Sequence, residues 1–548
     1  MKFFRCLFVL FLCTLFHLSV NASMYVHDGY TDKRSYNPGD TVRVYLNGMG
    51  NFSNAQIYLY NINNVTVDAA TVNLFPQLMN IVNPWENGFG YAETFQYIIP
   101  LTLHSGIYKW EDNVFFIVKS ATKNAAITLI YPTNTEEAYN PAGGKSLYDF
   151  NSPTGRAHIV SFQRPYNNWM ITEARGFSTA FVQWMNTLNY DFQMIADVDM
   201  DDSSEFQNSR LLVVVGHSEY WTRTARLNFD AFVDGGKDAV VLSGNTMWWQ
   251  VRYSADKKQL ICYKDSALDP EPNPLLKTIN WPSASLHYSV MESIGVDWIH
   301  GAYANNLSYH GFSGFNILLP SSPLFAGTGL ALNSVLSCQA TEDDATLFSG
   351  FAPNGDPILD STTLGFCKIE LLGYDWGASL SYPNAPAKGY GTFVAFRKTP
   401  SSGNIINVGN ANWCGSHVSS ALGGFGGADV LKIETITSNM FDLLLSGGNI
   451  YSNSSGCAVA VNAIAPVENF CRVFPNPTSG NLFVRISSPT MSNYDLQIFN
   501  SVGQVVQAQA LQSNEQEIDL TDLAEGTYYY FIQANNEIIS RGKIVVVR

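Results

Sequence analysis

Between residues 124 and 250 the chain alternates continuous apolar runs with segments of helical spacing. The apolar runs are residues 126–130 (AITLI), 191–199 (DFQMIADVD), 211–215 (LLVVV) and 238–245 (DAVVLSGN). Apolar runs without polar alternation are typical of strands buried on both faces of a parallel sheet. The region therefore predicts an α/β fold in which helices cover both faces of a parallel sheet.

Two helices are predicted between these strands. Residues 171–190 (ITEARGFSTAFVQWMNTLNY) have helical spacing, and a second helix follows residue 220. Its apolar positions Ala225, Phe229, Phe232 and Val233 lie at i, i+4, i+7 and i+8, which is one helix face. Gly235 and Gly236 are expected to end it.

The rest of the chain has other patterns. Short alternating strands and turns before residue 120 predict a β-sandwich, and several short strands recur after residue 472. Periodicity weakens between residues 250 and 450, which are expected to complete the α/β domain with long insertions. The predicted organisation is a signal peptide at 1–22, an immunoglobulin-like β-sandwich at 23–120, an α/β domain at 121–455, a linker at 456–471 and a C-terminal β-sandwich at 472–548.

The first residues have the form of a secretory signal peptide. Lys2 and Arg5 precede an apolar run from Cys6 to about Val20, and small residues surround Ala22. The alternative is a membrane anchor, although the run is shorter than the roughly 20 apolar residues of a spanning helix. No later segment is expected to cross a membrane.

Composition and charge narrow the function. Only 14% of the 548 residues are charged and the formal net charge is −15, so the chain lacks the basic footprint of a nucleic-acid-binding protein. Export to an oxidising compartment allows up to three disulfides, in fifteen possible pairings. The six cysteines beyond the signal peptide are Cys262, Cys338, Cys367, Cys414, Cys457 and Cys471.

Polar side chains follow each predicted strand. They are Tyr131 and Tyr139 after the first, Asp197 and Asp199 at the second, His217 and Glu219 after the third, and Asn245 after the fourth. Parallel strands present their carboxyl ends at one edge of the sheet, where ligands bind. These residues are therefore candidates for one site, although a helix N-cap is an alternative role for Asn245.

The segment GHSEYW at residues 216–221 allows two interpretations. A serine-hydrolase elbow would make Ser218 the nucleophile, but Tyr220 stands where that motif needs a small residue. Alternatively, His217 and Glu219 point together into the pocket and serve a hard metal ion or acid–base chemistry. Hydrogen bonds to the backbone at a strand end are a third, purely structural role for this pair.

A longer resemblance bears on that choice. Three segments carry it: YPTNTEEAYNPAGGKSLY (131–148), FVQWMNTLNYDFQMIADVDM (181–200) and LLVVVGHSEYWTRTARLNFDAFVDGGKDAVVLSGNTMWWQVRY (211–253). They resemble the large-subunit domain of the N,N-dimethylformamidase family. The resemblance implies an α/β core like that of class I glutamine amidotransferases. It also implies that two tyrosines and one glutamate hold a mononuclear iron, and that the protein hydrolyses an amide C–N bond.

The same resemblance assigns residues. Glu219 corresponds to the glutamate ligand, and His217 and Asn245 to catalytic residues. Tyr139 corresponds to one tyrosine ligand and Tyr108 to the other, with Tyr97 and Tyr148 as alternatives. A further acid of the family is not placed, and its candidates are Asp356, Glu370 and Asp375.

The C-terminal region carries a second resemblance. FPNPTSGNL, LQIFNSVGQVV and LAEGTYYYFI are similar to the C-terminal sorting domain of the type IX secretion system of Bacteroidota. This implies that the type IX machinery is a partner and that the protein is secreted or held at the cell surface after crossing the periplasm and outer membrane.

Together these features predict a secreted, metal-dependent amidase that acts on a linear C–N bond of a small amide or polymer-derived substrate. The alternative is a noncatalytic cell-surface protein that binds glycan or peptide on the same scaffold. Three tryptophans near the site, Trp221, Trp248 and Trp249, are expected to be core or pocket wall, or else a platform for a planar substrate.

Overall fold

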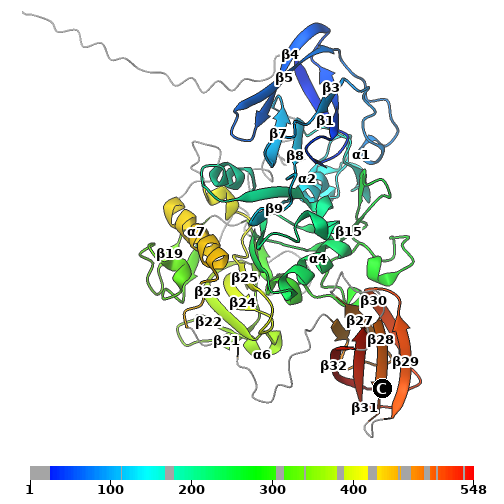
Figure 1. The fold of residues 1–548 in the computed structure, drawn as a ribbon, viewed down its shortest axis with the longest axis vertical. Coiled ribbons are helices and arrows are strands. Elements are labelled where there is room, and N and C mark those ends of the chain that lie inside the picture. Colours follow the sequence, from blue (N-terminus) through cyan, green and yellow to red (C-terminus); the bar gives the residue numbers. More distant parts are fainter. Residues whose placement is uncertain are drawn as a thin grey trace, which may run out of the picture.

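A computed structural model describes residues 25–548 except 113, 167–177, 304–313, 339–340, 379–387, 418–428, 454–456, 458–470, 487–493, 501–503 and 535–536. The predicted signal peptide lies outside the described residues. The chain forms three β-rich parts that follow one another from the blue N-terminal part to the red C-terminal part (Figure 1). Among the helices of the described ranges, none has the length and apolarity to cross a membrane.

The N-terminal part contains two sheets. One has the order β1-β3-β6 and the other the order β2-β8-β7-β4-β5. The strands are β1 (Val26–Thr31), β2 (Ser35–Tyr36), β3 (Thr41–Gly48), β4 (Phe52–Asn61), β5 (Thr66–Leu74), β6 (Phe95–Ile98), β7 (Gly106–Trp110) and β8 (Val114–Val118), with the short helix α1 (Pro84–Asn87). Alternate residues of β3 are buried, as expected for a strand with one face on a core.

A nine-stranded sheet organises the central part. Its order is β11 (Phe192–Ala196), β9 (Ile127–Tyr131), β12 (Leu211–Gly216), β14 (Asp238–Ser243), β25 (Asn404–Asn407), β24 (Lys388–Arg397), β23 (Lys368–Ala378), β18 (Phe315–Ile317) and β19 (Val335–Leu336). The first five strands are parallel, which confirms the prediction, and the last four add to the sheet in antiparallel fashion. The antiparallel half was not predicted, because its strands lie among long insertions.

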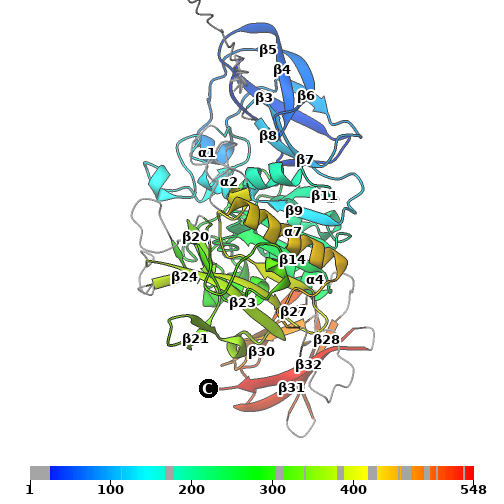
Figure 2. The ribbon, with the colours of Figure 1, turned by 90° about the vertical axis from the view of Figure 1, so that its left-hand side faces the viewer.

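Both faces of β12 are buried. Leu211, Val213 and Val215 join an apolar cluster with helix α7 (Val430–Ser446), whereas Leu212 and Val214 join another with helix α4 (Arg223–Asp234). Figure 2 shows α7 crossing the front of the sheet. The two-faced burial explains why the strand has no polar alternation.

The helix predicted after residue 220 is confirmed, and the helix predicted at 171–190 is confirmed only in part, because residues 186–190 are not helical. Helix α4 buries Ala225, Phe229, Phe232 and Val233, and Gly235 caps its C-terminus. Of the predicted helix at 171–190, residues 178–185 are helical and residues 171–177 lie outside the described residues.

One predicted strand boundary was wrong. Strand β11 ends at Ala196 rather than near Asp199, because the Asp199 carboxylate accepts a hydrogen bond from the Ala196 N–H at 2.9 Å and the chain enters a 3-10 turn. Asp197 accepts from the Asn134 N–H at 2.7 Å. These two aspartates therefore stabilise backbone at the strand end.

Smaller elements surround the main sheet. They are α2 (Thr133–Tyr139), α5 (Val290–Ile294), α6 (Ser361–Leu364), β10 (Ile159–Ser161), β13 (Tyr220–Thr222), β15 (Trp249–Tyr253), β16 (Gln259–Ile261), β17 (Asp297–Tyr303), β20 (Glu342–Ala345), β21 (Phe348–Phe351) and β22 (Pro357–Leu359). Strands β10, β16, β15 and β13 form a separate four-stranded sheet, and β17 pairs with β20.

The described cysteines form one disulfide, where the sequence allowed up to three. Cys367 is bonded to Cys457 across 90 residues of sequence. The other four described cysteines, Cys262, Cys338, Cys414 and Cys471, are buried in three apolar clusters, of which Cys338 and Cys414 share one. Burial raises the pKa of the Cys262 and Cys338 thiols to about 12, so these side chains behave as small apolar core residues.

The C-terminal part consists of two further sheets, β26-β27-β30 and β29-β28-β31-β32. Its strands are β26 (Cys471–Phe474), β27 (Asn481–Ile486), β28 (Tyr494–Phe499), β29 (Val505–Leu511), β30 (Glu515–Asp519), β31 (Gly526–Ala534) and β32 (Glu537–Val546). Glu515 forms an ion pair with Arg223, the first residue of α4, and accepts from Arg485 at 3.2 Å. All three side chains are at most 8% exposed, so a buried charge cluster joins the C-terminal part to the central part.

Replacing Glu515 with alanine is expected to destabilise this junction, because Arg223 and Arg485 would keep their charges in a buried place. The expected loss is about 3 kcal/mol of unfolding free energy, measured by chemical denaturation of the full chain. Glu517→Ala, at an exposed residue of the same strand, is the matched control. Equal stability of the two variants would contradict the assignment.

Candidate functional site

All of the predicted ligands and catalytic residues except Tyr108 meet at the carboxyl edge of the parallel strands. Tyr139 is the last residue of α2, which follows β9. His217 and Glu219 lie between β12 and β13, and Asn245 follows β14. All but Tyr139 are at most 5% exposed, and Tyr139 is part-buried against them.

Two glycines let these loops approach one another. Gly216 has φ +70°, and a Cβ there would lie 1.9 Å from the Ser178 Oγ. At Gly244 an added Cβ would lie 2.1 Å from the Glu342 carbonyl oxygen. Both positions therefore require glycine, and each precedes a candidate residue, His217 or Asn245.

Phenol and carboxylate oxygens lie within hydrogen-bond distance of one another. The Tyr148 hydroxyl lies 2.8 Å and 2.6 Å from the two Glu219 oxygens, to which it donates. The Tyr139 and Tyr148 rings are 4.4 Å apart between centroids. The structure thus gathers two tyrosines and one carboxylate in a buried space.

His217 lies at the centre of this group. Its Nδ1 is 3.1 Å from the Gly244 carbonyl oxygen, which can only accept, so Nδ1 carries the proton. Its Nε2 then accepts from the Tyr139 hydroxyl at 3.2 Å. The same Nε2 lies 3.6 Å from Glu219 and 3.5 Å from Glu342.

Glu342 completes the cluster and was not predicted. It opens β20, and its Oε2 accepts from the Asn245 Nδ2 at 2.7 Å. Its position could not be inferred because it lies far along the chain in a region of weak periodicity. The only available signal was the implied further acid of the resembled family.

Asn245 does not cap a helix. It has φ +49° in a turn that leads into strand β15, so the alternative role suggested by the sequence is wrong. Its Oδ1 is buried and makes no hydrogen bond within the described residues. An acceptor in that state is available to a bound molecule.

Of the tyrosine candidates, Tyr148 and not Tyr108 lies beside Glu219. The Tyr108 ring is in the core of the N-terminal sandwich, and its hydroxyl donates to the His104 carbonyl oxygen at 2.9 Å. Burial raises its pKa to about 12. Tyr97 donates to Asp68 at 2.9 Å on the same sandwich.

Charge and burial act together in the cluster. Burial raises the pKa of the Glu219 carboxyl and holds that of the Tyr148 phenol well above its ordinary value. The Lys264 ammonium lies 3.5 Å from the centroid of the Tyr148 ring, and burial lowers its pKa to about 8. Lys264 is thus a nearby cation that the sequence did not indicate.

A buried ion-pair network holds the segment that carries the tyrosines. Glu137, fully buried in α2, is paired with Arg164 and lies 2.9 Å from Arg34. Arg164 also donates to the carbonyl oxygens of Ala142 and Lys145, at 3.0 Å and 2.9 Å. These bonds fix the backbone between Tyr139 and Tyr148.

The other candidates have structural surroundings. Ser218 is 1% exposed and its Oγ accepts from the Trp221 indole at 3.0 Å, which is not the setting of an activated nucleophile. Trp221 is a core residue, and the half-buried Trp249 packs against an apolar cluster with its ring centroid 4.7 Å from the Lys264 ammonium. Trp248 is half-buried next to Trp249.

The three acids considered for the unplaced family residue have partners outside the cluster. Asp356 accepts from the Tyr374 hydroxyl, Glu370 from Ser452 and Asp375 from the Gly314 N–H. Glu342 is the carboxylate that contacts His217 and Asn245.

The donor set suits a hard cation. Phenol and carboxylate oxygens from Tyr139, Tyr148 and Glu219 are hard ligands. A cation would offset the burial that raises the pKa values of Tyr148 and Glu219. Within the described residues, His, Cys, Asp and Glu alone form no group of three that could hold a metal. A metal here would therefore depend on the tyrosines.

Two regions of the chain match known protein families, and the first is the C-terminal region. Residues 472–547 match the model of the secretion system C-terminal sorting domain. The protein is therefore exported, to be secreted or attached at the cell surface, and its C-terminal tail implies handling by type IX secretion.

Among curated proteins, none matches this chain. A crystal structure described as a ThuA-like protein from Bacteroides uniformis is 14% identical, with a TM-score of 0.25, and covers 50% of this chain and 89% of that chain. Residues 73–419 match the model described as N,N-dimethylformamidase beta subunit-like, C-terminal. That match spans more than half of the sequence, so the chain belongs to the N,N-dimethylformamidase beta subunit-like family.

Proposed function

We propose that the protein is a secreted, iron-dependent hydrolase of an amide-like C–N bond. The observation that carries this proposal is that two tyrosines and one carboxylate lie together. The Tyr148 hydroxyl is 2.6 Å from Glu219, and the Tyr139 hydroxyl is 3.2 Å from the His217 Nε2, which is itself 3.6 Å from Glu219. Glu219, Tyr139 and Tyr148 would hold a mononuclear iron, with Tyr148 in the role first assigned to Tyr108.

Bound iron would act as a Lewis acid that polarises the amide carbonyl and acidifies water. The fit rests on the chemistry of the donors, since hard anionic oxygens are the ligands that such an ion prefers. The nearby Lys264 ammonium would favour the ionised form of the Tyr148 phenol, because a positive charge lowers the cost of a phenolate.

The other residues of the cluster supply proton transfer and orientation. With its proton on Nδ1, His217 would accept a proton at Nε2 from the attacking water. Glu342, 3.5 Å from that atom, would stabilise the protonated ring as a carboxylate, then take the proton from His217 and deliver it to the leaving nitrogen. The Asn245 Nδ2 already donates one hydrogen to Glu342, and it would donate its second hydrogen to the developing oxyanion.

The substrate is proposed to be a small or polymer-derived amide outside the cell. The export tail supports this choice, because an exported enzyme meets environmental or surface material. The predicted likeness of the central domain to class I glutamine amidotransferases remains part of this proposal, and the five parallel strands that carry the site are compatible with it.

Glu219→Gln is expected to abolish iron binding, because the amide removes the anionic ligand without changing the side-chain volume. Metal per chain would be measured by elemental analysis. Glu136→Gln is the matched control, since Glu136 is another buried carboxylate that accepts from a tyrosine, Tyr131, at 2.6 Å. Full retention of iron by Glu219→Gln would refute this metal site, whereas a folded wild type without metal or colour would favour the noncatalytic binding protein.

Tyr148→Phe tests the phenol ligand. Tyrosinate bound to ferric ion absorbs visible light, so the wild type should be coloured and the variant should lose most of that band. Tyr131→Phe keeps the band, because Tyr131 is bonded to Glu136 rather than to Glu219. A spectrum unchanged in Tyr148→Phe would mean that Tyr148 is not a ligand.

Glu342→Gln is expected to lower kcat about a hundredfold or more with little change in KM, because the glutamine cannot carry a proton. The rates would be measured by ammonia or amine release from a panel of amides. Glu370→Gln, at an acid bonded to Ser452, should keep the wild-type rate. If Glu370→Gln lost activity and Glu342→Gln kept it, Glu370 rather than Glu342 would be the acid.

A further inference from the structure

A separate cavity lies at the opposite edge of the central sheet. It has a volume of about 570 Å³, which suits a small molecule. It opens where β12 and β14 begin, since Arg210 and Lys237 directly precede those strands. The candidate hydrolase residues lie where the same strands end, so this cavity is a different place.

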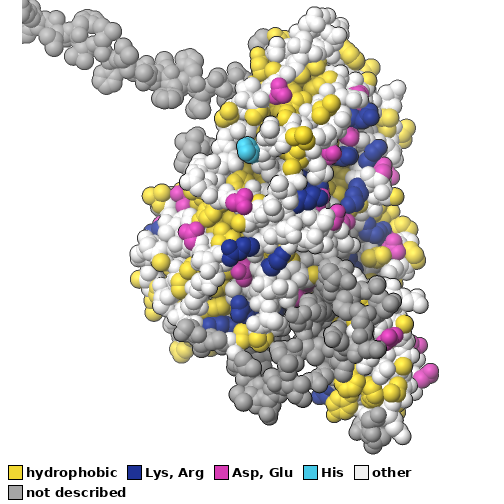
Figure 3. All heavy atoms as spheres, in the orientation of Figure 1, with side chains coloured by type: hydrophobic (Ala, Val, Ile, Leu, Met, Phe, Trp, Pro, Cys, Tyr) yellow, Lys and Arg dark blue, Asp and Glu magenta, His cyan; other side chains and the backbone are white. Residues whose placement is uncertain are grey.

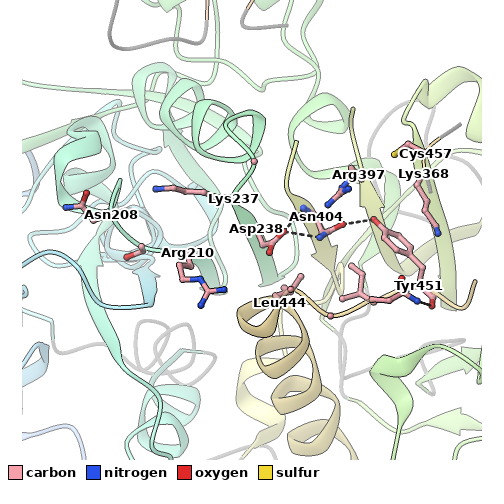
Figure 4. A pocket seen from close by; sticks show the side chains of 16 residues that line it. Asn208, Arg210, Lys237, Asp238, Lys368, Arg397, Asn404, Leu444, Tyr451 and Cys457 are labelled. Carbon is pink, nitrogen blue, oxygen red and sulfur yellow. Dashed lines mark hydrogen bonds between the residues drawn. The ribbon is translucent and has the colours of Figure 1, made fainter. Parts of the chain in front are cut away.

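Four cationic side chains line the cavity. They come from four places in the chain: Arg210 before β12, Lys237 before β14, Lys368 at the start of β23 and Arg397 at the end of β24. Figure 4 shows Arg210 and Lys237 on one side and Arg397 and Lys368 on the other. Lys and Arg side chains also gather across the middle of the face in Figure 3.

This positive charge is not balanced by the cavity lining. Asp238 is the carboxylate that lines it, and it already accepts from the Asn404 N–H at 2.7 Å and the Asn404 side chain at 3.0 Å. Arg210 and Lys237 donate to main-chain carbonyl oxygens, which are neutral. The cavity is thus cationic although the whole chain has a net charge of −15.

Arg397 has donor capacity left for a ligand. Its Nε is buried and makes no hydrogen bond within the described residues. A guanidinium presents a planar pair of donors that matches a carboxylate or sulfate. A buried donor of this kind without a partner is unfavourable unless a bound group accepts from it.

Neutral polar groups surround the cations. The Tyr451 hydroxyl donates to the Asn404 Oδ1 at 3.1 Å, and Asn208 and Asn449 line the same space. The Lys368 ammonium lies 4.2 Å from the centroid of the Tyr451 ring and donates to the Asn453 carbonyl oxygen at 2.8 Å. Amides and an aromatic ring beside cations are groups that bind sugar hydroxyls and ring faces.

We infer that this cavity binds an anionic sugar, a ring that carries a carboxylate or a sulfate. The oxyanion pairs with Arg397 and Lys237, and the hydroxyls bond to the asparagines. This function is independent of the proposed hydrolase, and it would attach an exported protein to acidic polysaccharide.

The full-length exported protein should be titrated calorimetrically with galacturonic acid, galactose 6-sulfate and galactose at low ionic strength. The two anionic sugars should bind and galactose should not. Arg397→Gln should weaken binding about tenfold or more, since a charged hydrogen bond is lost. Lys258→Gln, at an exposed lysine elsewhere, should bind like the wild type.

Several outcomes would overturn the proposal. They are galactose binding as tightly as its acid, no binding of either anionic sugar, unchanged binding by Arg397→Gln, or inorganic sulfate binding as tightly as the sugar sulfate. If Arg397→Gln does not fold, Lys237→Gln replaces it: it should weaken binding about tenfold or more, and unchanged binding would overturn the proposal. Glu219→Gln separates the sites: it should still bind the sugars, and loss of binding there would place them in the hydrolase site.

Discussion

The buried charge of Glu137 is the constraint on which the candidate site depends. A carboxylate with no exposed surface is costly unless it is paired and fully hydrogen-bonded, and Arg164 and Arg34 meet that need. Arg164 uses its remaining donors on the backbone between the two tyrosines. The ion pair therefore fixes the positions of Tyr139 and Tyr148 before any ligand arrives.

This network also gives the N-terminal sandwich a part in the site. Arg34 comes from the loop before β2 of the sandwich, yet its guanidinium lies 2.9 Å from Glu137 in the central part. Tyr108, in the same sandwich, packs in its core and contributes to the fold instead. The sandwich thus supports the site through a charge rather than through a ligand.

Much of this arrangement followed from the sequence because it depends on local pattern. Leu211 to Val215 is apolar throughout, which requires a strand buried on both faces, and such strands place His217, Glu219 and Asn245 at one edge. Tyr148 and Glu342 could not be fixed in this way. Each reaches the site from an irregular loop or an antiparallel insertion, where contacts and not periodicity decide position.

The two edges of the sheet favour ligands of opposite charge. Buried oxygen donors at the carboxyl edge repel one another and favour a cation, whereas the cations at the amino edge favour an anion. The six-residue strands β12 and β14 separate these edges by about 20 Å, at which two unit charges interact by only about 1 kcal/mol at an effective dielectric constant of about 20. Occupancy of one site should therefore leave the electrostatics of the other almost unchanged, and a single polymer chain could engage both only by passing around the sheet.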